Sequence, residues 1–235
     1  MGISDLETLS NDEIAALPVD RRALLVLADA VQLDTWNWRN WCLGFSQNRP
    51  SPGLATAEAA IAEAWGWLIS RTLISTKGGS YDFHDFHVTT AGREALERGL
   101  AYVQATIRLD VELVPSLERK VRPQFLLGDF ELAAFAAMRE VEIAVRDLGG
   151  LGTDLVGVPL MQNAFREGGP LHDPTVHPAE SVAQMNLYAG AMGLFKNPAS
   201  HRRVDYYDPS EASEVILLAD LLLRILQRQR ASSSS

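Results

Sequence analysis

Amphipathic helical segments closed by glycine or proline constrain the fold of this chain more than any other feature. Residues 54–71 are rich in Ala and Glu and carry apolar residues on one helical face. Residues 130–148 form a second such segment, which ends at Gly149-Gly150. Strand-like alternation of apolar and polar residues appears around Phe86–Thr89. The sequence therefore predicts a mainly α-helical protein with a small β element.

The first half of the chain predicts a winged helix-turn-helix domain. Residues 54–96 follow the order helix, short apolar strand, turn, strand and helix. The turn, Lys77-Gly78-Gly79-Ser80, suits a hairpin, and the last helix opens at Thr90. This order resembles the wing region of a winged helix. We place this domain at residues 20–105, after an N-terminal arm at 1–19.

The second half predicts a separate helical domain at residues 129–230. Residues 106–128 are punctuated by prolines and are interpreted as a linker, and residues 231–235 as a disordered serine tail. The predicted helices of this domain cover residues 130–148, 153–165, 179–195 and 209–229. Across the chain, the predicted N-caps are Asp20, Thr153 and Asp208.

Composition limits the classes of function. The formal net charge of −9 argues against broad capture of DNA or RNA through the phosphate backbone. Any contact with nucleic acid is expected at two local basic segments, residues 119–122 and 196–203. The longest apolar run, Val215–Leu223, contains Asp220 and is too short to span a bilayer. The lone cysteine, Cys42, and the absence of a signal-peptide pattern favour a cytoplasmic protein without membrane contact.

The segment around residues 196–203 carries the residues best suited to chemistry. A helix is expected to end at Asn197-Pro198, because a residue before proline disfavours helical geometry. His201 follows the break, with Lys196 and Asn197 before it. A histidine can transfer protons near neutral pH, while a cation and an amide can hold a phosphate. These groups are what RNA cleavage without a metal requires.

This segment resembles the signature of HEPN domains, in which an arginine is followed after four to six residues by a histidine. It is most similar to the Ymh-type subgroup, whose signature is approximately Phe-Arg-Asn-Pro-x-x-His. The resemblance spans about residues 125–230, and supporting matches are Leu160–Phe165, Glu180 and Gly190-Ala191.

The resemblance implies a four-helix bundle that forms a homodimer and cleaves RNA without a metal or other cofactor. His201 would then be the acid–base or substrate-orienting group, Lys196 would stand at the arginine position and Asn197 beside it. Arg202 and Arg203 are expected to add phosphate contacts by proximity. Lysine offers a point charge instead of a bidentate fork, so a member that binds without cutting stays an alternative. A purely structural reading is that Asn197-Pro198 breaks the helix and His201 hydrogen-bonds the helix end.

Other candidate residues provide weaker evidence for a functional site. His84 and His87 lie three apart in a predicted strand, where they face opposite sides and lack further ligands, so we predict no metal site. The tryptophans could stack on bases but are interpreted as core or subunit contacts. Helix 54–71 carries Glu58 and Glu63, which argues against DNA binding and favours a protein partner for this domain. The tryptophans are Trp36, Trp38, Trp41, Trp65 and Trp67.

The lead hypothesis is therefore a dimeric, metal-independent endoribonuclease of the HEPN type, with a toxin–antitoxin or anti-phage role implied by family analogy. The alternative is a non-catalytic HEPN and winged-helix binding module that acts as adaptor or regulator of a partner protein. A DNA-binding regulator is a third hypothesis, which the charge disfavours.

Overall fold

The computed structural model describes residues 6–32, 36–196 and 208–233, and it is mainly helical, as predicted. The chain forms two compact units, residues 1–103 and 104–235. Among the described helices, none combines the length and apolar character of a membrane span. The elements of the first unit are η1 (Leu6–Thr8), α1 (Asn11–Ala16), α2 (Val19–Val31), β1 (Trp36–Asn37), α3 (Trp38–Gln47), α4 (Leu54–Ser70), β2 (Ile74–Thr76), β3 (Asp85–Val88) and α5 (Thr90–Arg108).

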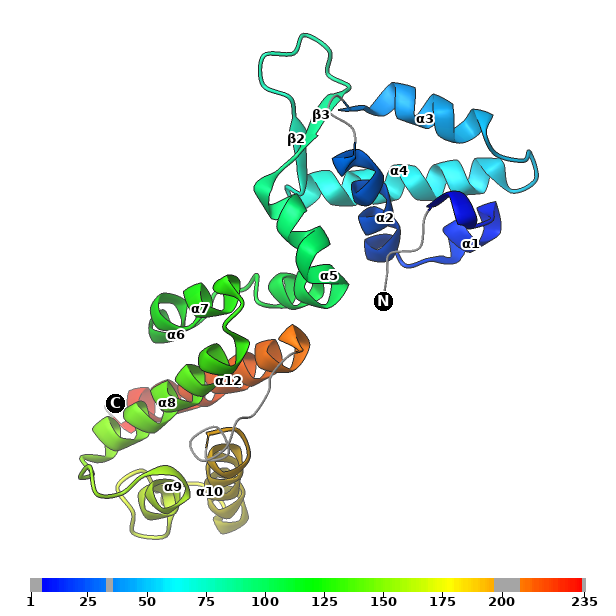
Figure 1. The fold of residues 1–235 in the computed structure, drawn as a ribbon. Coiled ribbons are helices and arrows are strands. Elements are labelled where there is room, and N and C mark those ends of the chain that lie inside the picture. Colours follow the sequence, from blue (N-terminus) through cyan, green and yellow to red (C-terminus); the bar gives the residue numbers. More distant parts are fainter. Residues whose placement is uncertain (1–5, 33–35, 197–207, 234–235) are drawn as a thin grey trace. The chain divides into compact units, whose positions relative to one another are not determined.

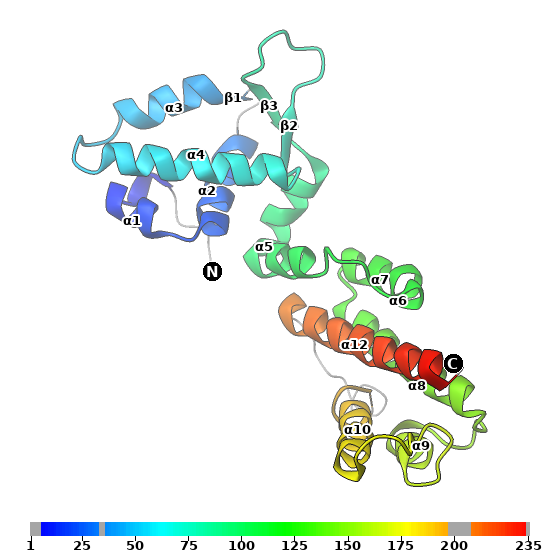
Figure 2. The ribbon, with the colours of Figure 1, turned by 180° about the vertical axis from the view of Figure 1, so that it is seen from behind.

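The first unit contains a small antiparallel sheet with strand order β1-β3-β2. The predicted hairpin is present as β2 and β3, with Ile74 opposite Val88 and Thr76 opposite Phe86. Strand β1, which the sequence did not indicate, pairs with the other edge of β3 (Figure 2). The hairpin follows α4 and precedes α5, in the predicted order (Figure 1).

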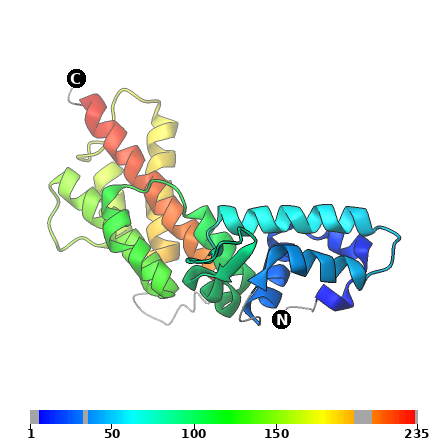
Figure 3. The same ribbon diagram turned by 90° about the horizontal axis from the view of Figure 1, so that it is seen from above.

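Helix α4 organises the packing of the first unit. Figure 3 shows α4 extending along this unit, and α1 and α2 pack against it. Its buried residues include Ile61, Trp65 and Leu68, the face expected from the sequence. The predicted cap of α2 is wrong, because the helix begins at Val19 after Pro18 without a side-chain cap. Proline pre-sets its own φ and leaves the first turn to start directly.

Three of the five tryptophans, Trp38, Trp41 and Trp65, form a stack between α3 and α4. The ring of Trp38 lies 4.1 Å from Trp65 and 5.5 Å from Trp41, centroid to centroid. Phe86 of β3 meets Trp65 edge-on at 4.6 Å. For these three tryptophans the contacts fit the prediction of a packing role, although α3 itself buries no residue fully.

The second unit is entirely helical over its described residues. Its elements, after the end of α5, are α6 (Pro115–Lys120), α7 (Arg122–Leu127), α8 (Phe130–Gly149), α9 (Gly157–Phe165), α10 (Pro178–Ala191), η2 (Met192–Lys196) and α12 (Pro209–Ser233). Helices α8 and α12 pack along each other (Figures 1 and 2) and supply more of the core than any other pair of helices in this unit. Tyr188 of α10 is fully buried there and donates a hydrogen bond to the Leu222 carbonyl at 2.7 Å.

The segment predicted as a linker, residues 106–128, contains the helices α6 and α7. Leu117, Val121 and Phe125 of this segment are fully buried in the core of the second unit. Its prolines stand in the first turn of each short helix, where the missing N–H costs no hydrogen bond. The prolines therefore start helices here and do not mark an extended connection.

Two aspartates hold the start of α12 and the connection before α6. The Asp208 carboxylate accepts the N–H of Ser210 at 2.8 Å, which confirms the predicted cap. Asp220, which is 8% exposed, accepts the N–H of Val114 at 2.7 Å and pairs with Arg224 at 2.6 Å. A carboxylate can be buried at this position because each oxygen has a donor.

At the N-terminus of α5, we expect one added methyl group to change the unfolding free energy of the first unit. A Cβ at Gly92 would lie 2.2 Å from the Leu73 carbonyl oxygen, whereas one at Gly66 in α4 meets nothing within 4 Å. Gly92→Ala should lower the unfolding free energy of the first unit by about 2 kcal/mol, through overpacking against backbone. Gly66→Ala should raise it by about 0.5–1 kcal/mol, because an exposed helical alanine orders more cheaply than glycine.

Tryptophan fluorescence measures this effect selectively, since all five tryptophans lie in the first unit. Urea titrations of both variants and the native chain should therefore separate the two effects. Equal midpoints for Gly92→Ala and the native chain would contradict the close approach of α5 to Leu73.

Candidate functional site

The predicted catalytic segment begins in a widened helical turn. Residues 178–196 are helical, as expected for 179–195, but the last five, Met192–Lys196, form a π-helical turn after α10. Such turns insert an extra residue, cost stability and occur often at functional sites. The turn carries Lys196 and leads directly into Asn197.

Lys196 is fixed by a buried carboxylate on α8. Its ammonium lies 2.9 Å from Oε2 of Glu142, and the two side chains are 13% and 7% exposed. Arg146, one helical turn further on, reaches Oε1 of Glu142 at 3.1 Å. The backbone N–H of Gly157 donates to Oε2 at 2.7 Å. We call these three side chains and the Gly157 N–H the Glu142 cluster.

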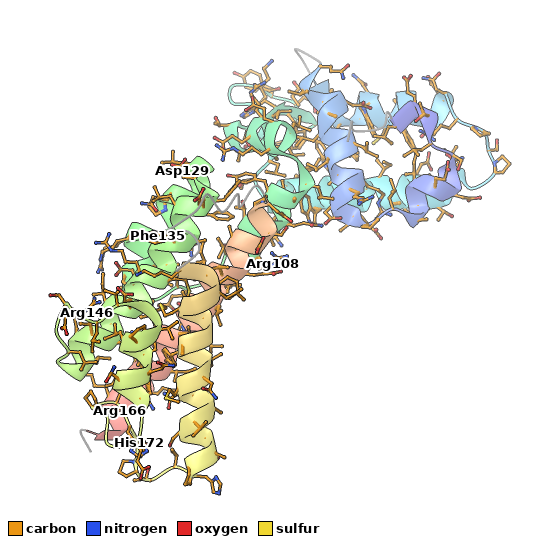
Figure 4. All side chains as sticks on the ribbon, turned by 60° about the horizontal axis from the view of Figure 1, so that its bottom comes forward. Arg108, Asp129, Phe135, Arg146, Arg166 and His172 are labelled. Carbon is orange, nitrogen blue, oxygen red and sulfur yellow. The ribbon has the colours of Figure 1, made fainter. Side chains whose placement is uncertain are left out.

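The cluster also explains where α9 starts. The predicted cap at Thr153 is wrong: α9 begins at Gly157, after Val156, without a local side-chain cap. The first N–H groups of a helix need acceptors from outside the helix. Glu142 supplies one of them, so a carboxylate from α8 takes the place of a local cap. Arg146, labelled in Figure 4, donates as well to the Leu155 carbonyl at 3.0 Å.

The donors around Glu142 outweigh its burial. Burial alone raises the pKa of the Glu142 carboxyl. The hydrogen bonds from Lys196, the Gly157 N–H and Arg146 lower it by more than burial raises it, so the pKa lies below its ordinary value. The cluster holds two cations and one anion, which leaves a formal excess of one positive charge. Nε of Arg146 is buried without a hydrogen-bond partner among the described residues.

The structure places only part of the predicted site. Lys196 is held in the Glu142 cluster, and its ammonium faces a carboxylate. Asn197, His201, Arg202 and Arg203 lie outside the described residues, so their assignments stay predictions.

Sequence reasoning missed Glu142 and Arg146. A signal was present, because Glu142 follows Met138 by four residues and precedes Val145 by three, which places it on the buried face of α8. An acid on an apolar helix face requires buried partners. Two cations supply them, one from the same helix and one from the end of η2.

The four histidines that the structure describes lie outside the Glu142 cluster. His84 Nδ1 lies 2.8 Å from the Asp82 carboxylate, and His177 caps α10 by accepting the Ala179 N–H at 3.2 Å. His87 is exposed on β3, and His172 lies in the loop before α10 (Figure 4). No group of three or more metal-binding side chains occurs among the residues described here.

The Glu142 cluster predicts an acid-sensitive contribution to the stability of the second unit. Glu142→Gln leaves two buried cations without their anion and should cost about 3 kcal/mol at pH 7, the low end for breaking a buried pair. Since the folded-state pKa of Glu142 lies below its unfolded value, its contribution is complete above that unfolded value, about 4.3, and is lost as pH falls through the folded value. The difference between the native chain and Glu142→Gln should therefore shrink in acid.

Glu118→Gln is the matched control, because Glu118 forms an exposed ion pair with Arg122 in the same unit. It should cost less than about 1 kcal/mol at pH 7. Far-UV circular dichroism during urea unfolding, with tryptophan fluorescence followed in parallel for the first unit, measures both. A loss for Glu142→Gln no larger than that of the control would contradict the cluster.

Comparison with known proteins places the second unit in a sequence family. A family model described as "Protein of unknown function (Hypoth_ymh)" matches residues 112–226. No curated protein and no solved structure matches the chain. The match includes α6 to η2, most of α12 and the whole Glu142 cluster. Residues 112–226, within the second unit, therefore form a Ymh-type domain.

Proposed function

We propose that this protein is a metal-independent endoribonuclease of the HEPN type, acting as a homodimer in toxin–antitoxin or anti-phage defence. His201 serves as acid–base, with Asn197, Arg202 and Arg203 as phosphate-binding groups. The observation that carries the proposal is the π-helical turn at Met192–Lys196, tied to Glu142 where the segment with His201 begins.

The cluster supports the proposal by holding one end of that segment in place. Catalytic groups need positions held to within a fraction of an ångström, and a buried pair resists displacement more than an exposed one. The short distances from Glu142 to Lys196 and to the Gly157 N–H tie η2, α8 and α9 together. Lys196 acts here as a positioning residue, because its charge is already paired. The phosphate-binding cations of the proposal are then Arg202 and Arg203.

An uncharged helix face beside the segment supports the dimer. Residues 181–195 contain no charged side chain in a chain that is 22% charged. Val182 and Leu187 of α10 are 52% and 45% exposed, and Leu194 in η2 is 65% exposed. Apolar exposed surface of this kind marks contact sites. A second copy on this face would bring two copies of the His201 segment near one another, as a composite cleft requires.

One observation favours the adaptor function as a second candidate. The cation at the family's arginine position, Lys196, is held by Glu142 at 2.9 Å and so is less available to a phosphate. A domain that keeps the scaffold but pairs this cation internally suits binding of a protein partner. The winged-helix-like first unit, with a balance of eight Lys and Arg against 13 Asp and Glu, would provide that contact.

His201→Ala tests the nuclease function directly. Purified native protein should cleave a labelled single-stranded RNA in the presence of EDTA, and His201→Ala should lose at least about 100-fold in rate, the contribution typical of a general acid–base. His87→Ala, which changes an exposed histidine of the first unit, is the control and should cleave normally. Equal cleavage by His201→Ala and native protein would remove the catalytic assignment. Native protein that leaves RNA intact would favour the adaptor.

Leu187→Glu tests the dimer. A charge on the α10 face should weaken association through the second unit, because burying an unpaired carboxylate opposes association. Leu221→Glu, on α12 at a similar exposure of 48%, should leave association unchanged. Sedimentation velocity measures the self-association of both variants. RNA cleavage should fall together with association in Leu187→Glu and should not fall in Leu221→Glu.

A further inference from the structure

The loop between β2 and β3 exposes two large aromatic side chains. Tyr81 is 102% and Phe83 is 86% exposed, the highest values among the large apolar residues that the structure describes. The loop, residues 77–84, extends away from α4 (Figures 1 and 2). We call it the wing loop. Two neighbouring aromatic rings in full contact with water indicate a surface that becomes covered by a partner.

A polar network holds the wing loop in shape. The Asn37 side-chain amide donates to Asp82 at 3.0 Å and to Asp85 at 2.8 Å. Ser80 donates to Asp85 at 2.6 Å, and the His84 N–H donates to Asp82 at 2.8 Å. These bonds use the polar residues that alternate with the aromatic ones, so Tyr81 and Phe83 are left to project. A preorganised loop of this kind loses little conformational freedom on binding.

An open hollow lies on α3, beside the wing loop. It has a volume of about 310 Å³. Its lining residues are Trp38, Arg39, Cys42, Leu43, Ser46 and His84. Leu43 is 53% exposed, and none of the ten residues of α3 is fully buried. Its Trp and Phe side chains are partly buried, whereas the side of α3 that carries Leu43 is open to solvent. We call this site the α3 hollow.

We propose that the wing loop of one chain inserts Tyr81 and Phe83 into the α3 hollow of a second copy, and receives the second copy's loop in return. The exposure of Tyr81 shows that the loop does not fill its own hollow. Because His84 belongs both to the wing loop and to the lining of the hollow, projection and recess form one continuous patch. Such a patch is self-complementary under a two-fold axis.

Charge supports a copy of this chain over a nucleic acid as the occupant. The hollow carries the exposed cation Arg39, and the wing loop carries Asp82, whose side chain is 51% exposed. Arg39 of one copy would face Asp82 of the second copy across the two-fold axis. Stacking on bases would instead bring phosphates toward Asp82 and Asp85. The inference concerns the first unit alone and does not depend on the proposed ribonuclease activity.

Cross-linking between Tyr81→Cys and the native Cys42 tests the insertion. Burial, with a contribution from Glu58, raises the pKa of the Cys42 thiol to about 11, so copper phenanthroline at alkaline pH is the suitable oxidant. The full-length Tyr81→Cys variant should give a covalent dimer on a non-reducing gel. The dimer should disappear in Tyr81→Cys with Cys42→Ser. No covalent dimer, or one that persists without Cys42, would overturn the proposal.

Ile69→Cys is the matched control, since Ile69 is exposed on α4 of the same unit. It should give no Cys42-dependent dimer, and a dimer as abundant as that of Tyr81→Cys would indicate random collision and overturn the proposal.

Sedimentation velocity of the full chain provides an independent measurement. Tyr81→Ser with Phe83→Ser should weaken self-association at least tenfold in the Leu187→Glu background, where the α10 face is already disabled. Unchanged association would overturn the proposal. If the double serine variant instead lost only affinity for a labelled single-stranded RNA, the loop would be a nucleic-acid contact and the self-insertion would be wrong.

Discussion

The second unit depends on one buried carboxylate. Glu142 accepts hydrogen bonds from Lys196, Arg146 and the Gly157 N–H, and these donors belong to η2, α8 and α9. A carboxylate in a medium of low dielectric is tolerated only when its oxygens are satisfied by donors of opposite or partial positive charge. The arrangement therefore couples the start of one helix to the end of another, and removing any donor affects both.

This coupling gives the π-helical turn a physical role. A π turn is less stable than an α turn, and it persists where tertiary contacts compensate for it. Here the compensation is the pairing of Lys196 with Glu142, at the residue before Asn197. The proposed catalytic segment thus begins at a fixed point of the scaffold. The cation that the HEPN resemblance assigns to phosphate binding is, in this chain, part of the support.

Each unit also carries an exposed apolar surface among its described residues. In the second unit it is the uncharged face of α10 and η2, and in the first it is the combination of wing loop and α3 hollow. These two patches are the surfaces on which the proposed contacts with a second copy rest. Their different shapes suit different contacts, one flat helix face and one projection with a recess.

Much of the secondary structure could be predicted from the sequence. The helices at 54–70 and 130–149, the β2–β3 hairpin and the Asp208 cap follow from periodicity, turn residues and capping, which act over a few neighbouring residues. Predictions that relied on a single local signal failed at Asp20 and Thr153. At both positions a competing feature, Pro18 or the distant Glu142, starts the helix.

By itself the sequence determined the helical class, the two-part organisation and the Ymh-type resemblance of the second half, because apolar spacing and short motifs are read locally. Only the tertiary structure decided that Lys196 pairs with Glu142 across 54 positions of the chain, and that Asp220 holds the Val114 N–H across 106. The physical reason is that the interaction energy of two charges depends on their burial and on the dielectric constant around them. Both are set only when separate helices pack together.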